Sequence, residues 1–151
     1  MVHASHDHQI FIADSGCDQT LVTNIWRVLA NTGRYVCMTG AFAGRSAGEL
    51  FPVVSAICKV VLPDGRALAL VGHEVLLDSN PHQVESLLSI HQSLRLRVNR
   101  IDDRSVFERD VRGLPGTQKA VFDKFELPFY FDGSKCFFEL SPISEEEMVL
   151  L

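Results

Sequence analysis

The stretch Phe11-Ile12-Ala13-Asp14-Ser15-Gly16-Cys17-Asp18-Gln19-Thr20-Leu21-Val22 decides how the rest of the chain is interpreted. An apolar segment with strand character ends on an acid, and a serine and a glycine follow at once. An acid at the end of a buried strand is costly unless it is hydrogen-bonded, shared or used in chemistry. A glycine two residues later lets the backbone turn sharply and approach that acid. The pattern is typical of a catalytic carboxylate on a rigid loop. Taken alone, it favours an ordinary Asx-turn between two strands, because short matches arise often by chance.

Length and composition indicate one globular domain. The 151 residues are 46% hydrophobic and 22% charged, which suits a packed core, and the net charge of −5 gives no reason to expect a nucleic-acid surface. No apolar run is long enough to span a bilayer and no signal peptide is recognisable, so a soluble, intracellular protein is expected. The cysteines form no C-x-x-C pair, which predicts reduced thiols.

The expected secondary structure is mainly β with one short helix. Two hairpins are expected, at Pro63-Asp64-Gly65 and at Asp132-Gly133-Ser134. Pro128 places its strand at an edge or a bulge. The other expected elements are strands at 9–13, 35–38, 52–62 and 66–77, a strand or helical turn at 21–29, a turn at 31–34, a helix within 84–94 capped by Ser86, a turn at 113–116, and a solvated tail or short helix from Ser144.

The glycine-rich segment 39–48 follows a predicted strand and has two open interpretations. It is either a flexible hairpin of the kind that closes over a cleft, or a mobile surface loop. The run from Gly40 to Ser46 is one residue shorter than a phosphate loop and has Arg45 where such a loop has Lys, so nucleotide binding is not expected.

No metal or other cofactor is expected. His3, His6 and His8 are close together near the N-terminus, but no further ligands follow at a suitable spacing, which favours a frayed, polar N-terminus. His73 lacks a second histidine at helical spacing and is expected to be a strand residue. Charges of both signs alternate over 95–112 and predict a solvated face.

Peptide hydrolysis by carboxylates needs two acids in one site, one as base on a water and the other, protonated, polarising the carbonyl. The chain has a single Asp-Ser-Gly, and Asp18 on the same loop would have to point the opposite way. A second Asp14 from a symmetry mate supplies the missing acid, because a two-fold axis brings identical loops together. The hydrolase hypothesis therefore predicts an obligate homodimer with a bell-shaped dependence of activity on pH.

Four stretches together resemble one family. Residues 12–20 look like the active-site loop of retroviral-type, retropepsin-like aspartic proteases, and the wider chain is similar to the protease segment of copia-type LTR retrotransposon polyproteins. Residues 52–56 with the hairpin that follows, 86–92, and 127–140 with the acidic tail carry the rest of the resemblance. It covers most of residues 9–147, although only the Asp-Ser-Gly loop is a chemically specific motif.

The resemblance implies a mainly β, retropepsin-like acid protease fold with one short helix and a C-terminal β-hairpin extension. The parts implied are a flexible N-terminus (1–8), a protease core (9–96), a strand-rich extension (97–143) and an acidic tail (144–151). A minimal domain of this type has roughly a hundred residues, so the extra strands are expected to build the dimer interface or to cover a sheet edge.

The implied function is a homodimeric aspartic endopeptidase that cleaves its own retrotransposon polyprotein, in the cytoplasm or within virus-like particles, without a membrane or nucleic-acid partner. Asp14 of each copy would form the dyad, Ser15 would hydrogen-bond across the two-fold axis, and Gly16 would allow the close approach. Cys17 stands where the family commonly has Ala. The implied flap and substrate-binding residues are Met38, Thr39, Gly40, Ala41 and Phe42. The second-loop element is Leu87, Leu88 and Ser89, where the family has apolar-apolar-Gly.

Two alternatives belong to other classes. One is a catalytically inactive dimerisation or interaction module with the same fold, within a polyprotein or a domesticated host protein. The other is a thiol mechanism with Cys17 as nucleophile and His73 as base, for which no oxyanion element or orienting group is visible in the sequence.

Overall fold

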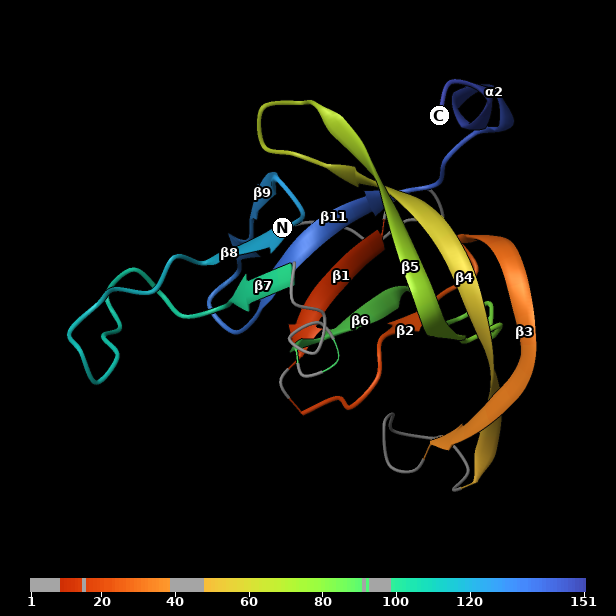
Figure 1. Cartoon of the computed structure of the whole chain (residues 1–151), viewed down its shortest axis with the longest axis horizontal. Coiled ribbons are helices and arrows are strands. Elements are labelled where there is room, and N and C mark those ends of the chain that lie inside the picture. Colours follow the sequence, from red (N-terminus) through yellow and green to blue (C-terminus); the bar gives the residue numbers. More distant parts are fainter. Residues whose placement is uncertain (1–8, 15, 39–47, 91, 93–98) are drawn as a thin grey trace.

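The computed structural model describes residues 9–14, 16–38, 48–90, 92 and 99–151, and confirms a mainly β chain (Figure 1). Within these residues, eight strands form one sheet in the order β10-β11-β1-β6-β2-β5-β4-β3, and a further pairing of β11 with β4 closes a β-barrel. Their bounds are β1 (Gln9–Asp14), β2 (Leu21–Val22), β3 (Arg27–Met38), β4 (Glu49–Val61), β5 (Ala67–Leu77), β6 (Glu85–Ser89), β10 (Tyr130–Phe131) and β11 (Cys136–Ser141).

A second, three-stranded sheet has the order β7-β8-β9, from β7 (Asn99–Asp102), β8 (Lys119–Phe122) and β9 (Phe125–Pro128). It packs on the barrel core through Ile101, Ala120 and Leu127. A short helix, α2 (Glu145–Val149), follows Ser144, which caps it in a capping box with Glu147, so the helix alternative for the tail is the correct one. No helix among the described residues is long and apolar enough to cross a membrane.

The core is built around β1, which lies between β11 and β6. Phe11 is buried and meets Trp26 edge to face, with ring centroids 5.3 Å apart. The indole Nε1 of Trp26 donates to Ser86 Oγ at 3.1 Å, which satisfies the polar end of a buried aromatic side chain. Segments from both ends of the predicted protease core are therefore joined across the centre of the barrel.

Both predicted hairpins are confirmed. At the first, Gly65 has φ of +88°, and its N–H donates to Leu62 O at 3.0 Å. At the second, Asp132 Oδ1 accepts hydrogen bonds from the N–H groups of Ser134 and Lys135, both at 3.0 Å. The apolar run before this turn is divided, because Pro128 ends β9 at the edge of the small sheet and the chain then enters β10.

Two element predictions are wrong. Residues 31–34 do not end a strand; they form an irregularity inside β3, where Gly33 has φ of +79° and donates to Asn31 Oδ1 at 2.9 Å. Turn-forming residues are thus accommodated as a bulge. Residues 85–89 are strand β6 and not a helix capped by Ser86, because β1 and β2 pair with them on both sides. Helical conformation begins at Ile90, and Leu94 lies outside the described residues.

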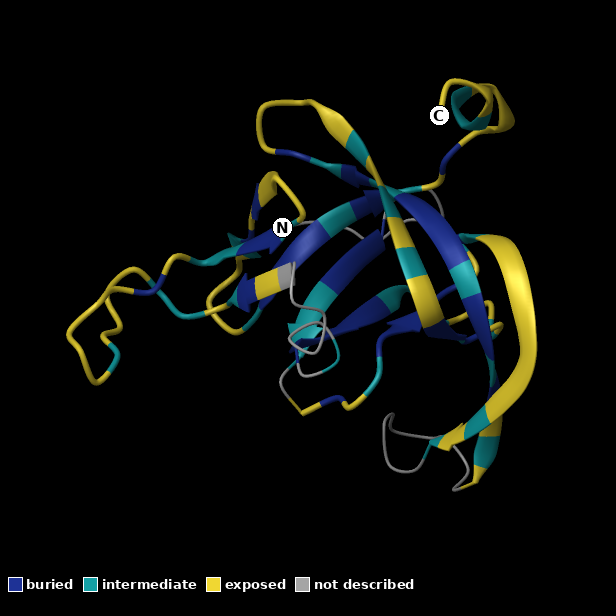
Figure 2. Cartoon of the chain, viewed as in Figure 1, coloured by how far each residue is buried: buried dark blue, intermediate teal, exposed yellow. Residues whose placement is uncertain are grey.

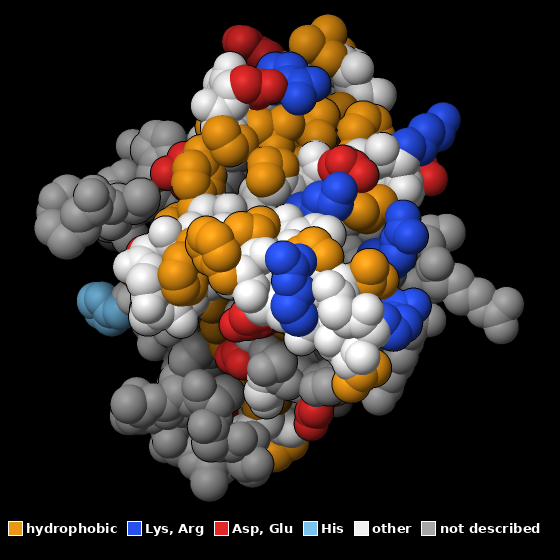
Figure 3. All heavy atoms as spheres, turned by 90° about the vertical axis from the view of Figure 1, so that its left-hand side faces the viewer, with side chains coloured by type: hydrophobic (Ala, Val, Ile, Leu, Met, Phe, Trp, Pro, Cys, Tyr) orange, Lys and Arg blue, Asp and Glu red, His pale blue; other side chains and the backbone are white. Residues whose placement is uncertain are grey.

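Residues 103–117, here named the arm, join β7 to β8 and project from the body (Figures 1 and 2; Figure 3 looks onto this side). Asp102 closes the base of the arm: one carboxylate oxygen accepts from Thr117 N at 2.9 Å, and the other from Arg104 Nε at 2.9 Å. Gly116 is required where the two sides meet, because a Cβ there would lie 2.3 Å from Ser105 O. Most of the arm's charged residues are exposed, and the two that are half-buried, Arg104 and Asp110, each pair with a neighbouring charge.

Substituting Asp102 should change how stability depends on pH. Burial alone would raise the pKa of Asp102, but hydrogen bonds from Arg104 and Thr117 lower it from 3.8 to about 2. A carboxyl group whose pKa is lower in the folded chain stabilises the fold above its unfolded pKa, and this contribution is lost as the pH falls through the folded pKa. We therefore expect Asp102→Asn to lower the free energy of unfolding at pH 7, and to flatten its decline between pH 3.8 and about 2, in urea denaturation. Asp103→Asn, at an exposed neighbouring position, is the control. A wild-type pH profile in Asp102→Asn would contradict the assigned role.

Candidate active site

Asp14 is the last residue of β1, and its half-buried side chain stands at the end of the strand. Its Oδ1 accepts a hydrogen bond from Gly16 N at 2.8 Å. A Cβ on Gly16 would lie 3.3 Å from that oxygen, so the backbone does approach the acid as closely as the sequence suggests. The same bond defines an Asx-turn, so the local geometry suits both original interpretations. Ser15 lies outside the described residues.

Strand β6 is inserted between β1 and β2. It runs parallel to β1, with Asp14 paired with Ser89 and Ala13 with Leu88, and antiparallel to β2, with Leu21 paired with Leu87. Residues 16–20 must therefore cross the end of β6 on the way from β1 to β2. The structure thus brings the predicted second-loop element, Leu87, Leu88 and Ser89, next to the candidate catalytic loop.

Ser89, the last residue of β6, fixes this loop through hydrogen bonds. Its side chain is fully buried, and its Oγ donates to Cys17 O at 2.6 Å while accepting from Gln92 N at 3.0 Å. Its backbone N–H donates to Thr20 Oγ1 at 3.1 Å. Gln92 Oε1 in turn accepts from Thr20 N at 2.7 Å. Both ends of the loop that follows Asp14 are consequently fixed to the end of β6.

Thr20 and Gln92 are site residues that the sequence prediction did not single out. They are 72 positions apart, and the signal that could have found them is polarity: each is a hydrogen-bonding residue at the end of a segment, 12–20 or 86–92, that carries the resemblance. Buried polar groups need partners, so such residues tend to find one another across a fold.

Cys17 is packed as a small core residue. Its thiol donates to Gln19 O at 2.7 Å, and its side chain lies in a cluster with Leu21, Phe51 and Leu76. Burial raises the pKa of the Cys17 thiol, and the negative charge of Asp14 adds to this effect. A raised pKa disfavours the thiolate that a nucleophile needs, and His73 is exposed on β5. The geometry therefore argues against the thiol mechanism.

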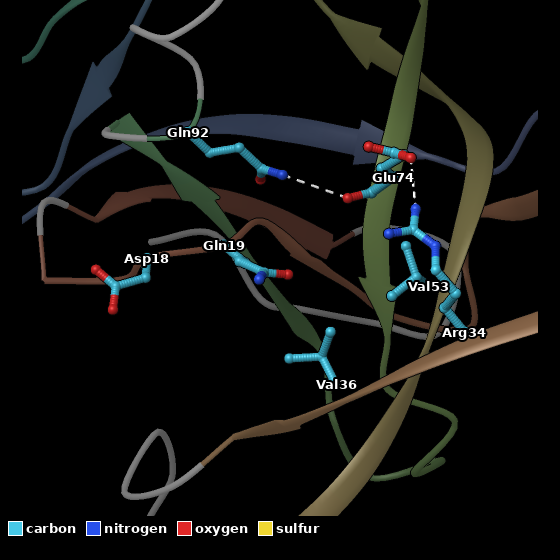
Figure 4. A pocket seen from close by; sticks show the side chains of 7 residues that line it. All are labelled: Asp18, Gln19, Arg34, Val36, Val53, Glu74 and Gln92. Carbon is cyan, nitrogen blue, oxygen red and sulfur yellow. Dashed lines mark hydrogen bonds and ion pairs between the residues drawn. The ribbon is translucent and has the colours of Figure 1, made fainter. Parts of the chain in front are cut away.

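A cavity of about 130 Å³ opens beside the loop (Figure 4). Its walls come from the loop, from β3, β4 and β5, and from Gln92, three residues after the end of β6. The lining residues are Asp18, Gln19, Arg34, Val36, Val53, Glu74 and Gln92. The side chains of Arg34 and Glu74 form an ion pair along one wall, and Gln92 Nε2 donates to Glu74 O at 3.3 Å. The lining of the cavity thus includes positively charged, negatively charged and neutral polar side chains.

A bulge in β5 aims Glu74 at this cavity. The register of β4 and β5 shifts between the pairs Val54–Val75 and Ala56–Gly72, so two residues of β5 oppose one of β4. Glu74 has φ of +54°, a conformation that non-glycine residues adopt uncommonly. The bulge lets Glu74 contact Arg34 on β3 and Gln92 beside the loop at the same time. A continuous set of contacts therefore joins β3 to the candidate catalytic loop.

Strands β3 and β4 lie on either side of the predicted flap segment. Met38 ends β3, is paired with Glu49 at the start of β4, and packs against the cluster that contains Cys17 and Leu87. The segment 39–48 therefore connects two antiparallel strands directly. The other predicted flap residues, Thr39, Gly40, Ala41 and Phe42, lie outside the described residues.

Neither a metal centre nor a known relative explains the site. His3, His6 and His8 lie outside the described residues, and within the described part of the chain no group of three or more His, Cys, Asp or Glu side chains is placed to hold a metal ion. In comparisons with protein-family models, with curated proteins and with solved structures, the chain has no significant match.

Replacing Ser89 should loosen the loop. Ser89→Ala leaves the carbonyl of Cys17 and the N–H of Gln92 without their buried partner. The loss of a buried hydrogen-bond partner costs about 1–3 kcal/mol, and we expect the free energy of unfolding in urea to fall by about that amount. Ser79→Ala, at an exposed position, should change it by no more than about 0.5 kcal/mol. Equal effects of the two substitutions would show that Ser89 does not hold the loop.

Proposed function

We propose that this protein is a homodimeric aspartic endopeptidase with a retropepsin-like fold, which cleaves the polyprotein of a copia-type retrotransposon. The observation that carries the proposal is the position of Asp14, at the end of a central strand with Gly16 N on its carboxylate and with the following loop fixed by Ser89. A carboxylate needs this support if it is to meet a second copy of itself in a defined geometry.

The chemistry requires both copies. One Asp14 carboxylate takes a proton from a water molecule while the other, protonated, donates a hydrogen bond to the scissile carbonyl. A single chain supplies one of these groups, and a two-fold axis through the paired loops supplies the other. The glycine after Asp14 keeps the loop free of a Cβ at the point of closest approach to the carboxylate, where one would lie 3.3 Å from Asp14 Oδ1.

The surroundings of the loop support a polypeptide substrate. Strands β3 and β4 pair antiparallel up to Met38 and Glu49, and both line the cavity beside the loop, which supports a flap in the segment that connects them. A cavity of about 150 Å³ can hold benzene, so the cavity of about 130 Å³ next to the loop has room for one amino-acid side chain of moderate size. Its charged wall of Arg34 and Glu74 favours a polar side chain at that position of the substrate.

The second candidate is a catalytically inactive dimerisation or interaction module with the same fold. The observation that favours it is the Asp14–Gly16 hydrogen bond, which an Asx-turn would make without any catalytic role. The two proposals share the dimer and differ in what Asp14 does, so a substitution of Asp14 separates them.

Asp14→Asn should abolish peptide cleavage while leaving the fold and the dimer intact. General acid and base catalysis contributes about 10²–10⁴-fold, so a loss of at least about 100-fold is expected with a peptide library read by mass spectrometry. Asp64→Asn, in the exposed turn between β4 and β5, is the matched control and should cleave at the wild-type rate. Equal cleavage by wild type and Asp14→Asn would refute the aspartic mechanism, as would a strictly monomeric active protein.

Glu74→Gln should alter substrate preference more than stability. Its ion pair with Arg34 is largely exposed, and such pairs contribute about 0–1 kcal/mol. Removing the charge from the cavity wall should redistribute the cleaved sequences of the library at one substrate position. The control is Glu126→Gln, which removes a similarly exposed carboxylate that pairs with Lys119 in the small sheet. If both variants keep the wild-type cleavage pattern, the cavity does not bind a substrate side chain.

A further inference from the structure

The arm is an ordered element despite its exposure. Asp102 closes its base, and a tight turn closes its tip, where Asp110 N donates to Leu114 O at 3.0 Å and Asp110 Oδ1 accepts from Leu114 N at 2.9 Å. Midway, Gly116 N donates to Glu108 O at 3.0 Å. Three successive cross-links therefore hold the two sides of the arm together.

This ordered arm presents large apolar side chains to solvent. Phe107 is 89% exposed, Val111 is fully exposed, and Val106 and Leu114 are about half exposed. Single exposed apolar residues need no explanation, but four on one projecting element mark an interaction surface. Figure 3, which looks onto this side, shows hydrophobic side chains gathered there among charged side chains of both signs. Because the arm is already ordered, its binding costs little conformational entropy.

The charge of the arm selects a second copy of the chain as its partner. The whole chain has a net charge of −5, so two copies repel each other over most of their surface. The arm carries equal numbers of acids and arginines, in alternation, so it adds no net charge repulsion where two copies would meet. These residues are Asp103, Arg104, Glu108, Arg109, Asp110 and Arg112. A surface that carries both charges and exposed apolar side chains can pair with a copy of itself, as a two-fold interface requires.

The size of the patch fits a share of a dimer interface. A stable interface buries roughly 800 Å² on each partner. With roughly 150–250 Å² for an aromatic side chain, Phe107 and the three aliphatic residues offer on the order of 400 Å². In Figure 1 the arm leaves the body on the side away from β3, β4 and β5, so it does not compete with the flap hairpin.

We propose that the arm packs against a second copy of this chain, with Phe107 and Val111 as its central contacts. This interface adds to the contact between the two Asp14 loops and rests on the proposed homodimer. It gives the extension beyond the predicted protease core a role in assembly, because the arm supplies apolar area that the loops alone lack.

The test compares two double variants of the full chain by sedimentation equilibrium. Phe107→Ser with Val111→Ser should raise the dimer dissociation constant at least tenfold. Val149→Ser with Leu150→Ser replaces the last residue of α2 and its C-cap, which are 84% and 85% exposed, and should leave the constant within twofold. Urea denaturation is used to check that both variants fold. An unchanged constant in the arm variant, or equal weakening by both variants, would overturn the proposal.

Cleavage assays separate this proposal from the catalytic one. The arm variant should regain wild-type cleavage when its concentration is raised, whereas Asp14→Asn should remain inactive with a wild-type dissociation constant. A wild-type chain that dimerises through the arm without cleaving peptides supports the interface and refutes the protease. If the chain cleaves peptides and its dimer dissociation constant does not respond to the arm substitutions, the protease is supported and the arm interface is refuted. A strictly monomeric wild-type chain would overturn the proposed interface, and the partner of the arm would then have to be a different protein.

Discussion

The hydroxyl of Ser89 is the contact on which the candidate site depends. It lies at the end of β6, in register with Asp14, and binds the carbonyl of Cys17 from beneath the loop. Because β6 separates β1 from β2, the loop between them has to pass over this hydroxyl. A buried hydroxyl that donates and accepts at once is fully satisfied, so the bond is retained only while β6 stays inserted. The position of the carboxylate is therefore a property of the whole barrel.

The same region shows how the cavity and the loop are linked. A bulge in β5 rotates Glu74 out of the regular ladder, so that its carboxylate pairs with Arg34 and its carbonyl accepts from Gln92. Bulges often re-aim a side chain next to a functional site, and here the result is a cavity wall that also supports the loop. Recognition of a substrate side chain and positioning of Asp14 would then share one set of contacts.

The C-terminal residues belong to the fold as much as to any extension. Strand β11 pairs with β1 on one side and β4 on the other, which closes the barrel and covers a sheet edge that would otherwise be exposed. The small sheet buries Ile101 and Leu127 against the same core, and only the arm between β7 and β8 projects. Adjacent parts of the chain thus close the barrel and form the projecting arm for which an interface is proposed.

Local sequence determined the features whose physics is local. The turns at Gly65 and Asp132, the strand that ends on Asp14, and the close approach at Gly16 could all be predicted, because a few neighbouring residues decide each of them. Only the tertiary structure decided the rest. Residues 85–89 have a helix-like pattern, yet they form a strand because β1 and β2 offer hydrogen bonds on both sides. The contact of Thr20 with Gln92 joins residues 72 positions apart, and no local pattern encodes a partner at that distance. Whether two Asp14 loops meet depends on how two copies of the chain associate, which neither the sequence nor the structure of one chain determines.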